Sequence, residues 1–327
     1  MARPTTGGGA PSNWSSPAGS DGASLAHLPA TVPAFQDVSL LDRIEGPWEP
    51  RNQGRRPTCT AFAVLAAEEL AHALDTGAKE IEPLSEEFIY HRMRTSFPPS
   101  LDLSDETKEY MKKSGATFLD QAAQVLQHEG VCGAADLPYL RHPDDLDGHV
   151  ADLSADQLAT LKALAAPRKI DYARNTWVSP DGMKMDQPWR FPIGDLTVSQ
   201  LVFAMLMQDI PSVVSLMIPV GSKRHGWDSD LAWECGRVGY RRPTTDDDYT
   251  AQDGHAVCVT GFILDPENSD RGWFVFRNSR GRYFAHNPAG DCPLTPPRPP
   301  ARGYGVISTE TVDAYCWEYV HRRPPGG

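Results

Sequence analysis

A cysteine stands at the point where the sequence predicts the start of a helix. Apolar residues recur every three or four positions over residues 59–76, and Gly77 can end the helix. The N-terminus of a helix presents unpaired N–H groups and a partial positive charge, which favour a thiolate over a thiol. Gln53, six residues before Cys59, could direct its side-chain amide to the same point. That amide and the Cys59 N–H would form an oxyanion hole, so this stretch predicts nucleophilic chemistry at Cys59.

A histidine and an asparagine stand beside two later apolar stretches. His255 comes directly before the strand-like residues 256–263, and Asn278 directly follows the strand-like residues 273–277. A histidine at the mouth of a buried strand can accept a proton from a cysteine thiol and later return it. An asparagine amide can orient the imidazole, which is the role of the third member of a catalytic triad. The sequence therefore predicts a Cys59, His255 and Asn278 triad.

The elements that must position these residues are mostly helices in the first half of the chain and strands in the second. Pro57 is expected to form a rigid turn and the Thr58 hydroxyl to cap the helix at 59–76. Ser85 is expected to cap a second helix. Further helices are expected over residues 118–129, 153–165 and 198–208, and strands over 212–218, 256–263 and 273–277. This order favours an α+β fold with two lobes.

The charge balance argues against two classes of partner. The chain has 31 Lys and Arg against 43 Asp and Glu, a net charge of −12. Nucleic-acid binders and proteins held on anionic membranes need an excess of basic residues on one face. The chain also contains no apolar stretch long enough for a transmembrane helix. We therefore expect no nucleic-acid partner and no membrane partner.

The N-terminal residues differ in composition from the rest of the chain. Residues 1–33 are rich in Gly, Pro and Ser, which predicts a disordered segment followed by a folded domain over 34–327. The N-terminus lacks the apolar core of a secretory signal. The six cysteines contain no C-x-x-C pair and are too few for a disulfide scaffold. These features favour reduced thiols and a cytoplasmic location, with secretion as an effector left open.

The three stretches that carry the candidate residues together resemble the papain-like cysteine peptidases. The stretch from Gln53 to residue 63 is similar to the family's Q-G-x-C-G-S-C-W-A-F, with the same spacing from glutamine to cysteine. His255-Ala256-Val257 is similar to the family's D/N-H-A-V, and Asn278-Ser279 to its K/R-N-S-W-G. Weaker matches occur at residues 84–87, 115–116, 130–139 and 303–307. The resemblance covers roughly residues 33–320, and the match at 303–307 is closest to bacterial members.

The resemblance implies an α+β fold with a helical lobe at about 50–170 and a strand-rich, β-barrel-like lobe at about 171–327. The active-site cleft would lie between the lobes. The implied activity is hydrolysis of peptide bonds in a protein or peptide substrate, without a metal or organic cofactor. The implied catalytic residues are Cys59, His255, Asn278 and Gln53, and the implied substrate-binding residues are Gly115, Ala116 and Gly254. No stretch resembles the family's inhibitory propeptide, so control by a regulatory partner is left open.

Three positions depart from the family pattern. Arg56 replaces a cysteine that usually forms a disulfide, and Thr60 replaces the tryptophan that follows the nucleophile. Arg280 replaces a tryptophan that shields the histidine–asparagine contact, so we expect a flexible charged side chain there to admit water and weaken that contact. Two alternatives therefore stay open. One is a binding module that keeps the fold without catalysis, and the other is a different cysteine-dependent acyl transfer, such as glutamine deamidation.

Overall fold

The computed structural model describes most of the chain beyond its N-terminal segment. The described residues are 32–45, 48–78, 81–99, 105–140, 150–176, 196–219, 226–239, 251–288 and 299–323. The segment 1–33, for which disorder is predicted, lies outside the described residues except at its last two positions. No helix in these ranges is long and apolar enough to cross a membrane.

The helix predicted at 59–76 is confirmed. Helix α1 (Cys59–Thr76) ends at Gly77, whose φ of 62° lies in the left-handed region that glycine adopts without steric strain. The expected cap is wrong, because the Thr58 side chain makes no capping hydrogen bond. The Thr58 hydroxyl instead lies 2.8 Å from the Tyr139 hydroxyl. This contact holds the turn before the helix against a segment from later in the chain.

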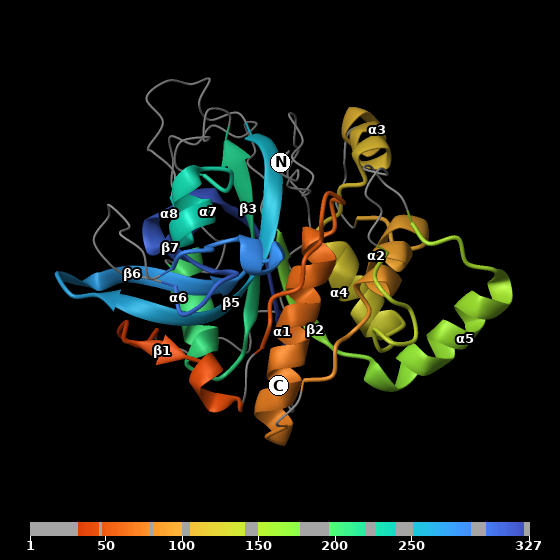
Figure 1. Ribbon diagram of the computed structural model, residues 1–327, viewed down its shortest axis with the longest axis horizontal. Coiled ribbons are helices and arrows are strands. Elements are labelled where there is room, and N and C mark those ends of the chain that lie inside the picture. The colour runs from red at the N-terminus through yellow and green to blue at the C-terminus, as the bar shows by residue number, and fades with distance from the viewer. Residues whose placement is uncertain are drawn as a thin grey trace.

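Four further helices gather on one side of α1 (Figure 1). They are α2 (Glu86–Thr95), α3 (Asp105–Ser114), α4 (Leu119–His128) and α5 (Ala155–Ala165). Ser85 caps α2 as predicted, since its hydroxyl accepts a hydrogen bond from Phe88 N at 3.0 Å. Apolar side chains of α1, α2 and α4 meet in one buried cluster that includes Leu65, Ile89 and Leu126. The predicted helices at 118–129 and 153–165 are confirmed, whereas α3 was not predicted.

A mixed sheet forms the other side of the molecule. Its strands run in the order β2-β8-β3-β5-β6-β7-β4, and the short β1 pairs with β5 beside this path. All neighbours are antiparallel except β4 and β7. Among the described residues, the end strands β2 and β4 do not pair with each other, so the sheet does not close into a barrel. The strands are β1 (Val38–Ser39), β2 (Tyr172–Thr176), β3 (Ser212–Pro219), β4 (Arg237–Val238), β5 (Ala251–Asp265), β6 (Asn268–Arg277), β7 (Tyr304–Ser308) and β8 (Cys316–Arg322).

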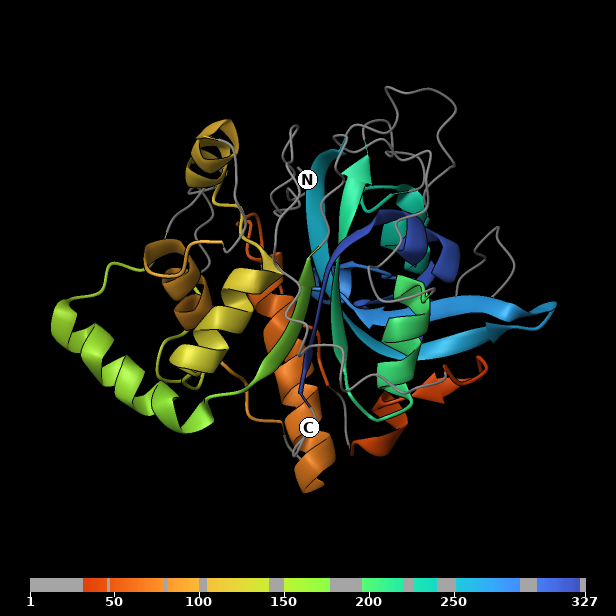
Figure 2. The same cartoon turned by 180° about the vertical axis from the view of Figure 1, so that it is seen from behind.

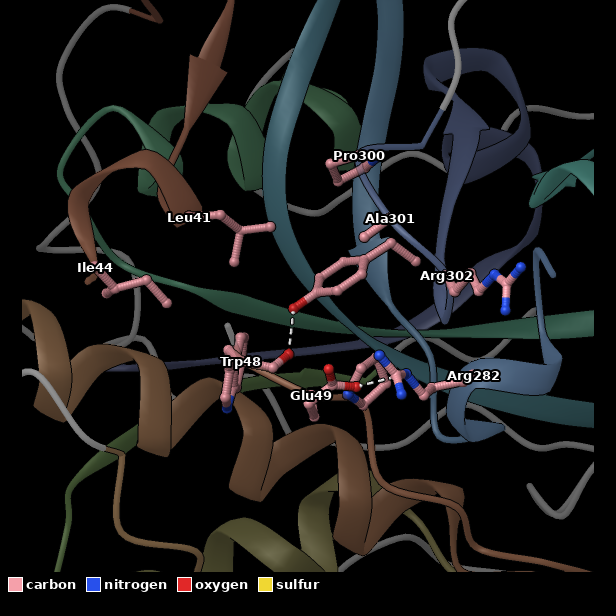
Figure 3. Close-up of a pocket in the computed structure, with 10 residues that line it drawn as sticks. Leu41, Ile44, Trp48, Glu49, Arg282, Pro300, Ala301 and Arg302 are labelled. Atoms are coloured by element: carbon pink, nitrogen blue, oxygen red, sulfur yellow. Dashed lines mark hydrogen bonds and ion pairs between the residues drawn. The ribbon is translucent and has the colours of Figure 1, made fainter. Parts of the chain in front are cut away.

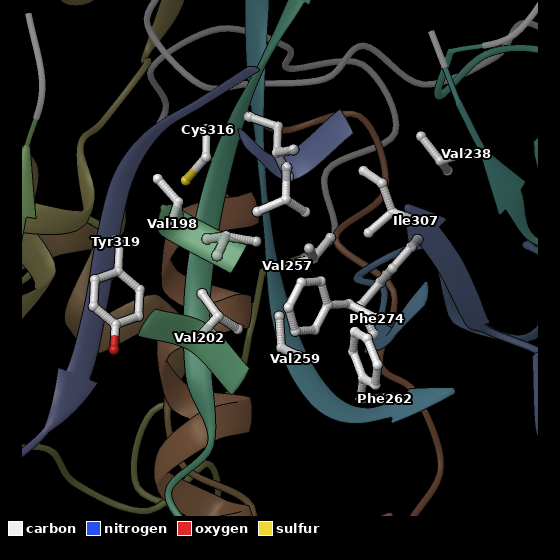
Figure 4. Close-up of a cluster of buried hydrophobic side chains, with 14 of the residues drawn as sticks. Val198, Val202, Val238, Val257, Val259, Phe262, Phe274, Ile307, Cys316 and Tyr319 are labelled. Atoms are coloured by element: carbon white, nitrogen blue, oxygen red, sulfur yellow. The ribbon is translucent and has the colours of Figure 1, made fainter. Parts of the chain in front are cut away.

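A second apolar cluster lies between the sheet and the helices that pack on it. Those helices are α6 (Val198–Leu206), α7 (Asp230–Cys235) and α8 (Thr309–Tyr315). Val202 of α6 and Val259 of β5 belong to this cluster (Figure 4). The Phe262 and Phe274 rings meet edge to face in it, with centroids 5.1 Å apart. Burial of these side chains determines which face of β5 points toward the apolar cluster between the sheet and these helices.

Helix α1 lies between the two parts of the molecule in both views (Figures 1 and 2). It contacts the helices on one side, and on the other side it packs against β5. The α+β class with a helical part and a strand-rich part is thereby confirmed. Because the first residue of α1 is Cys59 and β5 carries His255, this junction brings the two predicted reacting residues onto facing elements.

Candidate active site

His255 and Asn278 form a buried hydrogen-bonded pair. His255 lies within β5 and not, as predicted, directly before the strand, whereas Asn278 directly follows the neighbouring antiparallel strand β6 as predicted. The His255 Nε2 and Asn278 Oδ1 atoms are 2.9 Å apart, and only 1% and 2% of the two residues are exposed. Asn278 Oδ1 also accepts a hydrogen bond from Ser279 N at 2.8 Å. Because this oxygen is an acceptor, His255 Nε2 must be the donor, which leaves the neutral ring with a lone pair on Nδ1.

The surroundings of His255 keep its ring neutral. Burial lowers the pKa of His255 to about 3, and the positive charge of Arg280 lowers it as well, while the Asn278 hydrogen bond acts in the opposite direction. Within the described part of the chain, His255 Nδ1 has no hydrogen-bond partner. At neutral pH the Nδ1 atom of His255 is therefore unprotonated and can accept a proton.

Gln53 is held at both its backbone and its side chain. Its backbone N donates to Ser279 O at 2.8 Å, and its backbone carbonyl accepts from the Tyr139 hydroxyl at 2.9 Å. The side-chain Nε2 donates to Arg56 O at 2.7 Å, and Oε1 accepts from the Ser279 hydroxyl. A primary amide carries two hydrogens, so one Nε2–H of a firmly oriented Gln53 is available to a further acceptor.

The loop that contains Gln53 pairs with the residues after Asn278. Asn52 and Arg280 form an antiparallel bridge, and Gly281 N donates to Arg51 O at 3.0 Å. Gly281 has a φ of 60°, and a Cβ there would lie 3.0 Å from the Asn52 Cβ. This close backbone approach fixes the loop before α1 to the end of β6. Gln53, Asn278 and His255 are thus joined by a continuous set of hydrogen bonds.

Cys59 lies at the start of α1, fully buried. It belongs to the same packed cluster as Ala256 and Cys258 of β5, and Ala256 is the residue after His255. The structure therefore brings Cys59 to the strand that carries His255, and the loop of Gln53 to the residues around Asn278.

Comparison with known proteins gives the fold. No family model matches the chain, and no curated protein matches it in sequence. Xylellain, a cysteine protease from Xylella fastidiosa, has a similar solved structure at 18% identity, with a TM-score of 0.54 over 99% of this chain and 98% of that one. The chain has the papain-like fold. Digestive procathepsin L 3 of Tenebrio molitor is similar at 13% identity, with a TM-score of 0.54 over 91% of this chain and 73% of that one. Procathepsin B from Trypanosoma congolense is similar at 11% identity, with a TM-score of 0.53 over 98% and 87%.

The Arg280 side chain is placed differently from what the sequence predicts. The side chain was expected to be flexible and to admit water, but the residue is only 4% exposed. Its Nη1 donates to Gly54 O at 3.1 Å, so the guanidinium extends along the loop of Gln53. The hydrogen bond between His255 and Asn278 is itself buried. The prediction that water reaches and weakens the contact between His255 and Asn278 is therefore wrong.

An aromatic side chain that the sequence reasoning missed covers His255. The Trp227 indole meets the His255 imidazole edge to face, with ring centroids 4.5 Å apart and planes at 69°. Trp227 lies before α7, outside every motif, and no spacing rule connects it to the histidine. Only the three-dimensional structure reveals this neighbour.

Arg56, which stands where the resemblance has a disulfide cysteine, is buried in a charge pair. Its Nη2 donates to Glu87 Oε1 at 3.0 Å. Its guanidinium also lies over the Tyr90 and Tyr139 rings, at 5.1 and 4.9 Å from their centroids. The pair links the loop before Cys59 to α2, so a noncovalent contact joins these segments.

The residues implied as substrate-binding lie in two places. Gly115 has a φ of 79° and accepts the Tyr90 hydroxyl hydrogen bond at 2.9 Å on its carbonyl. The Thr60 hydroxyl, next to Cys59, donates to Thr117 O at 3.2 Å and so ties residues 115–117 to the start of α1. Gly254 is buried in β5 directly before His255. The substrate-binding role of Gly115, Ala116 and Gly254 stays a prediction.

A cavity of about 290 Å³ lies elsewhere on the molecule (Figure 3). Its walls include Leu41, Ile44 and Trp48, and an ion pair between Glu49 Oε2 and Arg282 Nε, 3.0 Å apart, lies beside them. None of the candidate catalytic residues lines it. Among the described residues, no three His, Cys, Asp or Glu side chains are grouped closely enough to hold a metal ion.

Proposed function

We propose that this protein is a cysteine-type endopeptidase in which Cys59 is the nucleophile, His255 the base, Asn278 the orienting residue and Gln53 the oxyanion donor. The observation that carries the proposal is the 2.9 Å contact between His255 Nε2 and Asn278 Oδ1, with Ser279 N on the same oxygen. It fixes the tautomer that a thiol-activating histidine needs, on a strand that packs against the helix of Cys59. The fold, shared with several cysteine proteases, supports the same assignment.

The proposed reaction begins with transfer of the Cys59 proton to the free Nδ1 of His255 as sulfur attacks the peptide carbonyl carbon. The carbonyl oxygen becomes an oxyanion, which accepts hydrogen bonds from Gln53 Nε2–H and the Cys59 backbone N–H. When the tetrahedral intermediate collapses, the C–N bond breaks and the imidazolium of His255 gives its proton to the leaving amine. Water then attacks the thioester, with His255 as the base, and releases the carboxylic acid and the Cys59 thiol.

Reactivity of the cysteines tests the nucleophile. Burial raises the pKa of Cys132 to about 11 and that of Cys258 to about 12, so these thiols carry almost no thiolate at pH 6. Cys59 is buried too, but the N-terminus of α1, at which it stands, favours its thiolate. Iodoacetamide at pH 6, followed by mass mapping, should therefore label Cys59 first. Preferential labelling of any other cysteine would contradict the assignment.

Hydrolysis of dye-labelled casein tests the activity itself. We expect release of small peptides by the wild-type chain and none by Cys59→Ala, with Cys258→Ala as the matched control that keeps activity. Ammonia release from the casein is measured in the same samples. Release of ammonia without release of peptides would indicate a deamidase and contradict the proposed peptidase. No product in either assay would favour a binding module.

A further inference from the structure

In the part of the chain that the structure describes, one hydrogen bond holds the His255 ring, and a second restraint comes from aromatic packing. The bond from Nε2 to Asn278 fixes one corner of the imidazole, but the ring can still tilt about that corner. The Trp227 indole lies against the same ring with a centroid separation of 4.5 Å. Trp227 is only 3% exposed, so its indole also keeps water from this face of the histidine.

Trp227 is itself held in place by a short turn and by a second aromatic ring. Within the turn, Ser229 N and Oγ both donate to Gly226 O, at 3.1 and 2.8 Å. Ser229 Oγ also accepts from Ala232 N at 3.1 Å and so caps α7. The indole also meets the Phe276 ring of β6 edge to face, with ring centroids 5.3 Å apart. The indole Nε1 has no hydrogen-bond partner in the described residues, so packing alone places the ring.

Helix α7 in turn is fastened to the residues that follow the site. His286 N donates to Trp233 O at 3.0 Å, and Asn287 N donates to Glu234 O at 2.9 Å. Residues 286–287 come shortly after Arg280 in the chain. The helix that directly follows the turn of Trp227 is therefore anchored to the same stretch of chain that carries Asn278 and Arg280.

We infer that Trp227 is a positioning residue for His255, which holds the imidazole plane for proton transfer and shields its bond to Asn278. The inference rests on the proposed function. The Trp227 indole would shield the contact between His255 and Asn278, which is the role that the resemblance gives to a tryptophan at the position of Arg280. The Arg280 guanidinium instead holds the loop of Gln53, because it donates a hydrogen bond to the Gly54 carbonyl.

The test compares Trp227→Ala with Trp227→Phe, and with Trp233→Ala as the matched control. Trp233 lies on α7 and packs on Phe284 at 6.1 Å, so its loss removes an indole from the same region without touching the His255 contact. NMR of the full chain with ¹⁵N-labelled histidine reports the tautomer and pKa of His255, and casein hydrolysis reports kcat and KM. Besides burial, the charge of Arg280 and the hydrogen bond to Asn278 set the pKa of His255, and both residues remain unchanged in every variant.

We expect Trp227→Ala to mix the two His255 tautomers, to raise the pKa of His255 as water enters, and to lower kcat by about tenfold to a hundredfold with KM nearly constant. Trp227→Phe should restore the tautomer and most of kcat, and Trp233→Ala should match the wild type. The inference is overturned if Trp227→Ala leaves the His255 signals unchanged, or if Trp233→Ala alters them equally. A wild-type chain that does not hydrolyse casein would defeat the proposed function, while the NMR comparison would still decide the role of Trp227.

Discussion

The two sides of the candidate active site are held together by different kinds of contact. On the helix side, the loop of Gln53 and Cys59 depends on two charge pairs, the buried pair of Arg56 with Glu87 and the partly exposed pair of Arg51 with Glu86. On the sheet side, His255 is held by strand pairing and by the Trp227 ring. A buried ion pair fails when either partner is removed, whereas aromatic packing weakens in proportion to the volume lost. The helix side should therefore be the more sensitive to single changes of charge.

Glu87 shows why this sensitivity is concentrated. Besides the Arg56 guanidinium, its carboxylate accepts hydrogen bonds from Leu140 N and Ala151 N, both at 3.2 Å. The residue is completely buried. One side chain thus joins α2, the loop before Cys59 and two segments from later in the chain.

The largest effect is expected from Glu87→Ala, which leaves the Arg56 charge buried without its partner. The free energy of unfolding should fall by about 3–5 kcal/mol. Urea unfolding followed by circular dichroism measures it. The double variant Arg56→Met/Glu87→Leu removes both charges and should recover much of the loss, and a single-variant loss below about 1 kcal/mol would refute the contrast between the two sides.

Gln53→Ala should produce the next largest effect, on rate rather than on stability. Gln53 contacts both sides, through Arg56 O and through Ser279. Loss of one oxyanion donor lowers kcat by about 10² to 10³, with a much smaller change in KM. Casein hydrolysis at several substrate concentrations separates the two constants. Ser279→Ala keeps the donor and loses only its anchor, so it should be milder, and an equal or greater loss there would mean that Gln53 is only structural.

Arg280→Met should produce the smallest effect, a shift in pH dependence. Because the pKa of His255 lies below its ordinary value, the unfolded chain binds a proton that the folded chain does not between pH 6.5 and about 3. Stability linked to this group is therefore lost as the pH falls through that window. Removal of the Arg280 charge should raise the pKa of His255 and make this loss smaller. Histidine NMR and melting temperatures at pH 4 and 7 measure both, and a His255 pKa that stays constant would contradict the role given to Arg280.

Local sequence signals were sufficient for the elements that carry the site. The start of α1 at Cys59 and its end at Gly77 follow from apolar periodicity and from glycine's access to positive φ. The pairing of β5 and β6, which brings Asn278 beside His255, follows from two apolar stretches close together in the chain. The ends of α1 and the pairing of β5 with β6 depend on residues close together in the sequence, and for that reason they can be predicted without a structure.

Contacts between distant segments were not readable in this way. Trp227 carries no local signal, because its partner His255 lies on another element. Arg280 was expected to be flexible and to admit water, yet the side chain is buried, with a hydrogen bond to the Gly54 carbonyl and a backbone bridge to Asn52. Strand β8 was not predicted either, because Cys316–Arg322 mixes charged and apolar residues. Its Glu318 is buried, although a glutamate in a sequence usually indicates an exposed position.

The position of β8 in the sheet has a consequence for synthesis on the ribosome. Among the described residues, this strand comes after the other strands in sequence but lies between β2 and β3 in the sheet. Until it emerges, β3 presents an unpaired edge on the side away from β5, and β2 has no strand to join. An unpaired apolar edge readily pairs with another chain. Nascent chains that stall after β7 should therefore self-associate and not accumulate as folded fragments.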